Sequence, residues 1–291
     1  MFDTENIPQL IKTYKEKWEE FRQVLVNKEL KDIDLERLKK ETFLSVIDNM
    51  LKYEKDNELI KVPFSKLYRD YTFCRATKID KDRDIEPLPF KRFLPNKQYI
   101  NDDNRFSPKN VEYLYLACNE KIIEERNYKY IEEVALKEVR AKKGEVYGVC
   151  KFRIPEKLNG SDKNIINLTI SDNKSIYEIQ EEFIKEYKKI RNYLTIYATE
   201  EQKKQQYKAT EIFVLKIYFY FMSQELFKPV KSDDKSNQYV PFHCIAKYFK
   251  QLGYDGIMYK STVCNNRHGK NIVLFDKYYA EPFEYRLLIK E

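Results

Sequence analysis

The chain has 291 residues, of which 42% are hydrophobic and 15% aromatic, a composition that excludes an intrinsically disordered protein. Its length allows one large domain or two smaller ones. The 54 basic and 47 acidic residues give a formal net charge of +7, but the lysines are scattered along helical faces and form no dense basic run. We therefore expect a solvated surface and do not expect nucleic acid as a partner.

The cysteines are odd in number and include no C-x-x-C pair, which favours free buried thiols in a reducing compartment over a disulfide framework or a zinc site. The five are Cys74, Cys118, Cys150, Cys244 and Cys264. The N-terminal sequence has no basic segment followed by an apolar one, and no apolar run reaches transmembrane length. We expect a cytoplasmic protein without a signal peptide, a bound metal or a membrane partner.

Residues 7–27 and 34–54 carry apolar side chains at helical spacing, and Asp34 is suited to cap the second helix. They predict a helical hairpin, and with it an N-terminal helical region over residues 1–62. Such a hairpin serves as a docked structural pair, a lid, a dimerisation element or a partner-binding module, and the sequence leaves these roles open.

Prolines punctuate residues 63–108, so short strands and ordered loops are expected there. Periodicity then predicts helices at 110–126, 128–142 and 175–226, and strands at 145–154, 256–259 and 272–275. An apolar helical stripe from Phe242 to Leu252 leads to Gly253, which is well placed to end that helix. We expect a second domain over residues 63–291, with the helical stretch 175–226 inserted into it.

Glu138 stands out because it lies seven, four and three residues after Ile131, Val134 and Ala135, which form an apolar helical face. A carboxylate on a buried face is costly unless it is paired or functional. Glu138 is therefore a candidate catalytic residue. The alternative is that the helix ends near this point and Glu138 is solvated or paired with Lys142.

Two arginines and a tyrosine are candidates for ligand binding. Arg75 lies among apolar neighbours, and Arg105 lies in a turn-rich sequence; the planar guanidinium group suits bidentate contacts with phosphate. Structural ion pairs are the alternative for both arginines. Tyr115 could stack on the flat ring of a ligand, or belong to the core.

Ser261 follows a predicted strand and precedes a polar loop, where its hydroxyl group could orient a ligand. A Ser-His-Asp triad is poorly supported, because only His243 and His268 are present and G-x-S-x-G is absent. G-x-G-x-x-G and G-x-x-x-x-G-K-[ST] are also absent, which argues against NAD held as a Rossmann redox cofactor and against a P-loop.

Six short segments, in this order and context, resemble the RES domain, a family named for an arginine, a glutamate and a serine. They are Leu67–Arg75, Asn104–Pro108, Tyr113–Ala117, Ala135–Glu138, Leu252–Ser261 and Gly269–Asp276. The resemblance covers roughly residues 63 to 276. The family degrades NAD and is related in fold to ADP-ribosyltransferase toxins, so the resemblance implies an α+β fold with a small mixed sheet around a cleft.

The resemblance also implies that NAD is cleaved at the nicotinamide–ribose bond by phosphate or water, so that NAD is a substrate rather than a cofactor. Inorganic phosphate is a co-substrate only if the cleavage is a phosphorolysis. It assigns catalysis to Glu138 and Ser261 and substrate binding to Arg75, Arg105 and Tyr115. Family members commonly act as growth-arresting toxins restrained by a helix-turn-helix antitoxin. A role in defence against phage would also agree with the resemblance. The long N-terminal hairpin departs from the compact toxins and puts the antitoxin in doubt.

Two alternatives to NAD cleavage remain at this stage. An ADP-ribosyltransferase that modifies a macromolecule would use the same cleft. A non-enzymatic helical binding module would be favoured by an exposed Glu138. The sequence does not decide between phosphorolysis and hydrolysis, and it leaves the oligomeric state open, including a homo-oligomer.

Overall fold

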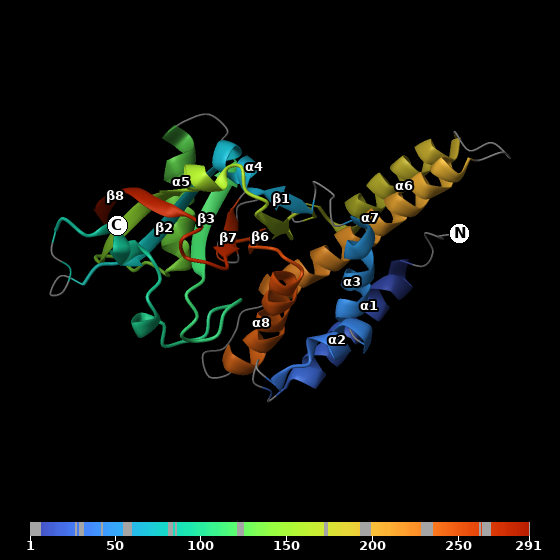
Figure 1. Cartoon of the computed structure of the whole chain (residues 1–291), viewed down its shortest axis with the longest axis horizontal. Coiled ribbons are helices and arrows are strands. Elements are labelled where there is room, and N and C mark those ends of the chain that lie inside the picture. Colours follow the sequence, from blue (N-terminus) through green and yellow to red (C-terminus); the bar gives the residue numbers. More distant parts are fainter. Residues whose placement is uncertain are drawn as a thin grey trace. The chain divides into compact units, whose positions relative to one another are not determined.

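The computed structural model describes residues 7–26, 28, 32–41, 43–54, 60–80, 84, 86–120, 125–171, 174–192, 199–227, 235–261, 263 and 269–290. These residues form eight α-helices and one mixed sheet of eight strands, which confirms the α+β class (Figure 1). The chain divides into two compact units, a helical unit and a unit that contains the whole sheet.

The helical unit comprises Met1–Ile60 and Leu168–Cys244, and the sheet unit comprises Lys61–Asn167 and Ile245–Glu291. The sequence placed a boundary near residue 62, close to this division. It treated residues 175–226 as an insertion into the second domain, whereas in the structure that stretch forms one unit with the N-terminal helices.

The helices of the first unit are α1 (Ile7–Leu25), α2 (Leu35–Glu41), α3 (Phe43–Glu54), α6 (Ile176–Asn192), α7 (Glu200–Phe227) and the first part of α8 (Lys235–Gln251). The predicted hairpin is present as α1, α2 and α3, and Asp34 caps α2 by accepting a hydrogen bond from the Arg37 N–H at 3.1 Å. Aromatic rings dominate the core of this unit, and the ring centroids of Trp18 and Phe43 lie 5.1 Å apart. In the described part of the chain, no helix is long and apolar enough to span a bilayer.

The sheet has the strand order β1-β5-β6-β7-β3-β2-β4-β8, and every pair is antiparallel except β5–β6. Its strands are β1 (Lys61–Pro63), β2 (Tyr71–Lys78), β3 (Leu114–Glu120), β4 (Val146–Arg153), β5 (Asn164–Asn167), β6 (Gly256–Lys260), β7 (Lys270–Leu274) and β8 (Glu281–Ile289). The same unit contains α4 (Phe64–Asp70), α5 (Glu125–Glu138) and short 3-10 turns at Phe90–Phe93, Lys97–Tyr99 and Glu156–Leu158.

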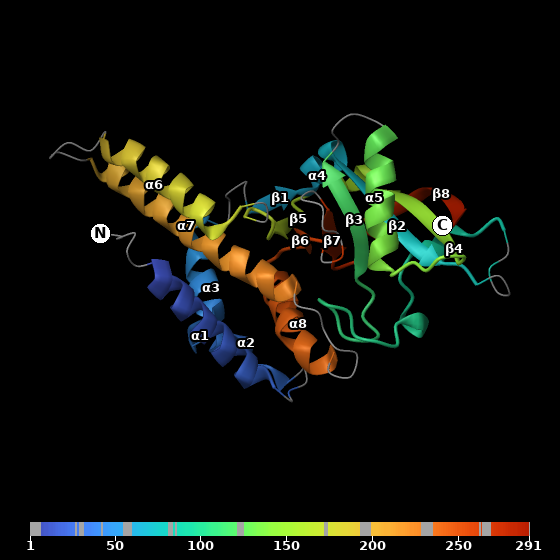
Figure 2. The ribbon, with the colours of Figure 1, turned by 180° about the vertical axis from the view of Figure 1, so that it is seen from behind.

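Helix α5 covers one face of the central strands, as Figure 2 shows. Its apolar residues Ile131, Val134 and Ala135 are buried in one cluster with Cys74 of β2 and Ala117 of β3. The opposite face belongs to a larger apolar cluster that includes residues of β2, β3, β4, β6 and β7. The apolar face that helical spacing gives α5 therefore packs on the sheet face that the alternation of the strands makes apolar.

The β2–β3 ladder covers only part of the two strands. It ends at Cys74 and Ala117. Beyond this point, β2 pairs only with β4 through Arg75–Lys78, and β3 pairs only with β7 through Leu114–Leu116. The two strands thus separate in the middle of the sheet. We call this opening between β2 and β3 the fork, and Arg75–Lys78 and Leu114–Leu116 lie on its two sides.

One predicted helix is wrong. Residues 110–126 were expected to be helical, but 114–120 form β3, 121–124 lie outside the described residues, and α5 begins at residue 125. Leu114 and Leu116 are buried on the sheet face opposite α5, which is the two-residue period of a strand. The segment is a strand despite its helical pattern because it pairs with β2 on one side and β7 on the other.

The end of α8 follows the prediction closely. Gly253 has φ 88° and its N–H donates to the Lys250 carbonyl, while the Tyr254 N–H donates to the Phe249 carbonyl, a Schellman arrangement. The Phe249 and Tyr254 rings also meet, with centroids 6.0 Å apart. Leu252, which the apolar stripe included, is exposed instead. The cap turns the chain into β6 and so fixes where Ser261 emerges.

Candidate functional site

Two adjoining cavities lie at the fork between β2 and β3. The smaller one has a volume of about 250 Å³, and its walls include Arg75, Tyr115, Glu138 and Asn271. The larger has a volume of about 760 Å³ and extends along the β2 side of the fork. Arg75, Pro95 and Ile100 line both cavities. The two cavities therefore meet at Arg75 and form one crevice.

Glu138 is the last residue of α5, where the chain turns toward β4. The turn is a second Schellman arrangement, in which the Ala141 N–H donates to the Leu136 carbonyl and Arg140 adopts φ 51°. A left-handed residue other than glycine costs roughly 1 kcal/mol. A carboxylate at the C-terminal end of a helix also faces the negative end of the helix dipole. This position is unfavourable for Glu138 unless other groups stabilise its charge.

Two side chains from neighbouring strands supply that stabilisation. The Ser261 hydroxyl donates to Glu138 Oε1 at 2.7 Å, and Asn271 Nδ2 donates to the same oxygen at 2.5 Å. Ser261 is fully buried at the end of β6, and its N–H donates to the Gly269 carbonyl at 2.8 Å. Ser261 therefore positions the Glu138 carboxylate, and its own hydroxyl group is already engaged.

Glu138 itself is exposed, and by that criterion alone a non-enzymatic binding module would gain support. Its environment differs from that of a surface carboxylate, however. Oε1 is held by two buried donors, the side chain lines the smaller cavity, and Oε2 has no hydrogen bond among the described residues. The exposure is what a carboxylate would show at the wall of an open cavity.

Arg75 is the most unusual cation of the site. Its Nη1 atom is buried and has no hydrogen-bond partner in the described part of the chain. Burial, with a further contribution from the nearby charge of Arg92, lowers the pKa of Arg75 to about 10. An uncompensated buried guanidinium group is costly, because its hydration is lost and no anion replaces it. Such a group at the junction of two cavities is suited to bind an anionic ligand.

Tyr115 lines the smaller cavity and also binds a neighbouring loop. Its ring lines the smaller cavity, and its hydroxyl accepts a hydrogen bond from the Phe106 N–H at 3.2 Å and lies 3.0 Å from Ser107 Oγ. Tyr115 therefore fixes the loop that carries Arg105. Arg105 itself lines neither of the two cavities.

Arg105 is nevertheless close to the site. Burial raises the pKa of Tyr259 on β6 well above its ordinary value, and the Glu138 carboxylate acts in the same direction. The charge of Arg105 opposes this shift, so its guanidinium group lies within electrostatic range of Tyr259. The Phe106 ring packs on Tyr259 with centroids 5.0 Å apart.

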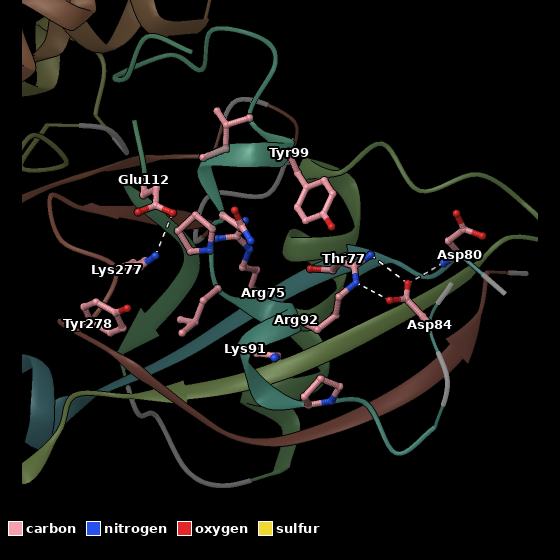
Figure 3. Close-up of a pocket in the computed structure, with 15 residues that line it drawn as sticks. Arg75, Thr77, Asp80, Asp84, Lys91, Arg92, Tyr99, Glu112, Lys277 and Tyr278 are labelled. Atoms are coloured by element: carbon pink, nitrogen blue, oxygen red, sulfur yellow. Dashed lines mark hydrogen bonds and ion pairs between the residues drawn. The ribbon is translucent and has the colours of Figure 1, made fainter. Parts of the chain in front are cut away.

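Figure 3 shows the larger cavity, in which Arg75 lies between two ion pairs. On one side, Lys277 contacts Glu112 at 2.9 Å, and this hydrogen bond lowers the pKa of Glu112. On the other, Arg92 binds Asp84 through two hydrogen bonds of 2.7 and 3.1 Å. The charges of Lys277 and Arg92 are thus balanced by neighbours.

The structure brings Arg75, Tyr115 and Glu138 to one crevice. Ser261 lines neither cavity and is joined to the site through its hydrogen bond to Glu138, although the four residues lie in separate segments of the chain. Asn271 was missed as a site residue. Its signal was an asparagine directly before the apolar run 272–275, where a polar side chain that becomes buried needs partners. Its Oδ1 atom is buried and lacks a partner among the described residues.

No group of three or more histidine, cysteine, aspartate or glutamate side chains that could hold a metal is present among the described residues. His243 is buried in α8, within the helical unit, and His268 and Cys264 lie outside the described residues. Comparison of the chain with protein-family models, curated proteins and solved structures finds no match.

Proposed function

We propose that this protein cleaves the nicotinamide–ribose bond of NAD in the crevice between β2 and β3. The observation that carries the proposal is the pairing of two groups on one cavity wall. Glu138 presents a carboxylate fixed by Ser261 and Asn271, and Arg75 presents a buried guanidinium nitrogen without a partner. One ligand that carries both a developing positive charge and an anionic group would satisfy both.

NAD has these two features. When the bond between ribose C1′ and the pyridinium nitrogen breaks, its electron pair goes to the ring, and nicotinamide leaves as a neutral molecule. The ribose is left as an oxocarbenium-like centre, which the Glu138 carboxylate would stabilise. Arg75 would bind the pyrophosphate. Phosphate or water then bonds to C1′, giving ADP-ribose phosphate or ADP-ribose, and water releases one proton.

The order of the residues also supports the proposal. Arg75, Tyr115 and Glu138, which carry the resemblance to the RES domain, line one cavity, and Ser261 binds Glu138 there. In a cell this turnover would deplete NAD. A growth-arresting toxin or defence effector, restrained by a partner such as a helix-turn-helix antitoxin, is therefore the role we propose.

The experiment is incubation of the purified protein with NAD, with and without phosphate, followed by mass analysis of the products. We expect free nicotinamide and either ADP-ribose phosphate or ADP-ribose. Glu138→Gln should lose most turnover, because loss of one electrostatic stabiliser costs roughly 2.7–4 kcal/mol, about 100-fold to 1,000-fold in kcat.

Glu133→Gln is the matched control, because Glu133 lies on the same helix, pairs with Lys137 and lines neither cavity. Intact NAD at high concentrations of folded protein, or equal activity of Glu138→Gln and the wild type, would contradict the proposal. Radiolabel from NAD that appears on lysate macromolecules rather than in small products would identify a transferase instead.

A further inference from the structure

The smaller cavity cannot hold a whole dinucleotide. Its volume of about 250 Å³ lies below the roughly 300–1,000 Å³ of ligand pockets. The adjoining cavity of about 760 Å³ lies within that range and is reached past Arg75. If the proposed function holds, the reacting end of the substrate occupies the smaller cavity beside Glu138. The rest of the substrate must then extend into the larger one.

The charges of the larger cavity determine where an anionic group would lie within it. Arg92 and Lys277 are each bound to a carboxylate, so neither presents an uncompensated charge. Lys91 also lines this cavity, but its side chain is exposed, so solvent and salt screen its charge. The partnerless Nη1 of Arg75 is at the junction of the two cavities. A phosphate or pyrophosphate bound there would place an uncharged group in the larger cavity.

The larger cavity offers aromatic surface for such a group. Tyr99, at the end of the Lys97–Tyr99 turn, has 75% of its surface exposed, and Tyr278 has 65% exposed. Lys277 Nζ lies 5.3 Å from the centre of the Tyr278 ring and covers part of that face. Tyr99 is therefore the more open of the two rings. A flat aromatic base stacks favourably on a tyrosine side chain.

We infer that the larger cavity is the subsite for the adenosine half of the substrate, with the base on Tyr99 and the pyrophosphate on Arg75. This inference rests on the proposed function for the identity of the reacting end. It adds that the protein selects dinucleotides over nicotinamide mononucleotide, because the mononucleotide leaves the larger cavity empty.

The first test measures binding without turnover. Calorimetric titration with ADP should show binding to the wild type. Tyr99→Ala should weaken it about fivefold or more, the change that corresponds to the loss of about 1 kcal/mol of base stacking. Tyr177→Ala should leave it unchanged, since Tyr177 is 73% exposed but belongs to the helical unit. Absence of ADP binding, or equal affinities of the two variants, would overturn the subsite.

The second test separates the subsite from the reaction. We expect kcat/KM for NAD to exceed that for nicotinamide mononucleotide, and Tyr99→Ala to lower only the value for NAD. Equal values for the two substrates, or an equal loss in the variant, would refute the subsite and leave NAD cleavage standing. If the wild type cleaves neither substrate, the proposed function fails, and the ADP titration alone decides the subsite.

Discussion

Replacing Ser261 by alanine tests whether the carboxylate is positioned or merely present. Ser261 is fully buried, and its hydroxyl donates to Glu138 Oε1 at 2.7 Å. A hydrogen bond to a charged group is worth roughly 1.5–3 kcal/mol. If that bond fixes the carboxylate in the transition state, its loss corresponds to a fall in kcat of about 10-fold to 150-fold.

The free energy of unfolding should change much less than the activation free energy. Glu138 is exposed, so water can replace the lost donor, and Asn271 Nδ2 still holds the same oxygen. We expect Ser261→Ala to lower the free energy of unfolding by about 1 kcal/mol. Nicotinamide release gives kcat and KM, and urea unfolding gives the stability.

Ser161→Ala is the matched control, because the Ser161 hydroxyl also donates a 2.7 Å hydrogen bond, to the Leu158 carbonyl, but lies at neither cavity. It should leave kcat unchanged. The reasoning is refuted if Ser261→Ala keeps kcat within about twofold of the wild type while its stability falls by more than 3 kcal/mol, since Ser261 would then be a purely structural residue.

Three further predictions concern packing, charge and thiols. A Cβ added at Gly256 would lie 2.4 Å from a backbone carbonyl oxygen of β7, so Gly256→Ala should lower the free energy of unfolding in urea by about 1–3 kcal/mol. Gly160 has open space around it, so the control Gly160→Ala should change that free energy by less than about 0.5 kcal/mol. Because the pKa of Arg75 is lowered to about 10, its positive charge is present below that pH and lost above it. ADP affinity should therefore fall as the pH rises through about 10, and an identical pH dependence in Arg75→Ala would contradict the assignment of Arg75 to anion binding. Burial raises the pKa of Cys118 and of Cys150 to about 12, so both should resist alkylation at neutral pH until the protein unfolds, as peptide mapping by mass spectrometry would show.

Local signals predicted the parts of the site that depend on one element. The apolar face of α5 and the position of Glu138 on it follow from helical spacing, and Gly253 marks the end of α8 because few other residues adopt its φ of 88°. The exposure of Glu138 corresponds to the alternative in which the helix ends near this residue. It follows from the end of the helix at residue 138, where the carboxylate passes the edge of the buried face.

Features that depend on distant segments could not be predicted. Sequence alone shows Arg75 as one more residue of a strand. Its role follows from the point where the β2–β3 ladder ends, at Cys74 and Ala117, and that point is a property of two strands far apart in the chain. Asn271 gains its role only because β7 lies beside β3 and α5 ends above it. The joining of residues 1–60 with 168–244 is likewise a long-range event that periodicity within either segment does not encode.

The structure of Glu138→Gln crystallised with NAD would test the central claim most directly, because this variant should bind the substrate without cleaving it. The account predicts the nicotinamide ribose beside residue 138, the pyrophosphate in contact with Arg75 Nη1, and the adenosine in the cavity of about 760 Å³. NAD bound elsewhere on the protein, or a crevice that stays empty at saturating NAD, would contradict it.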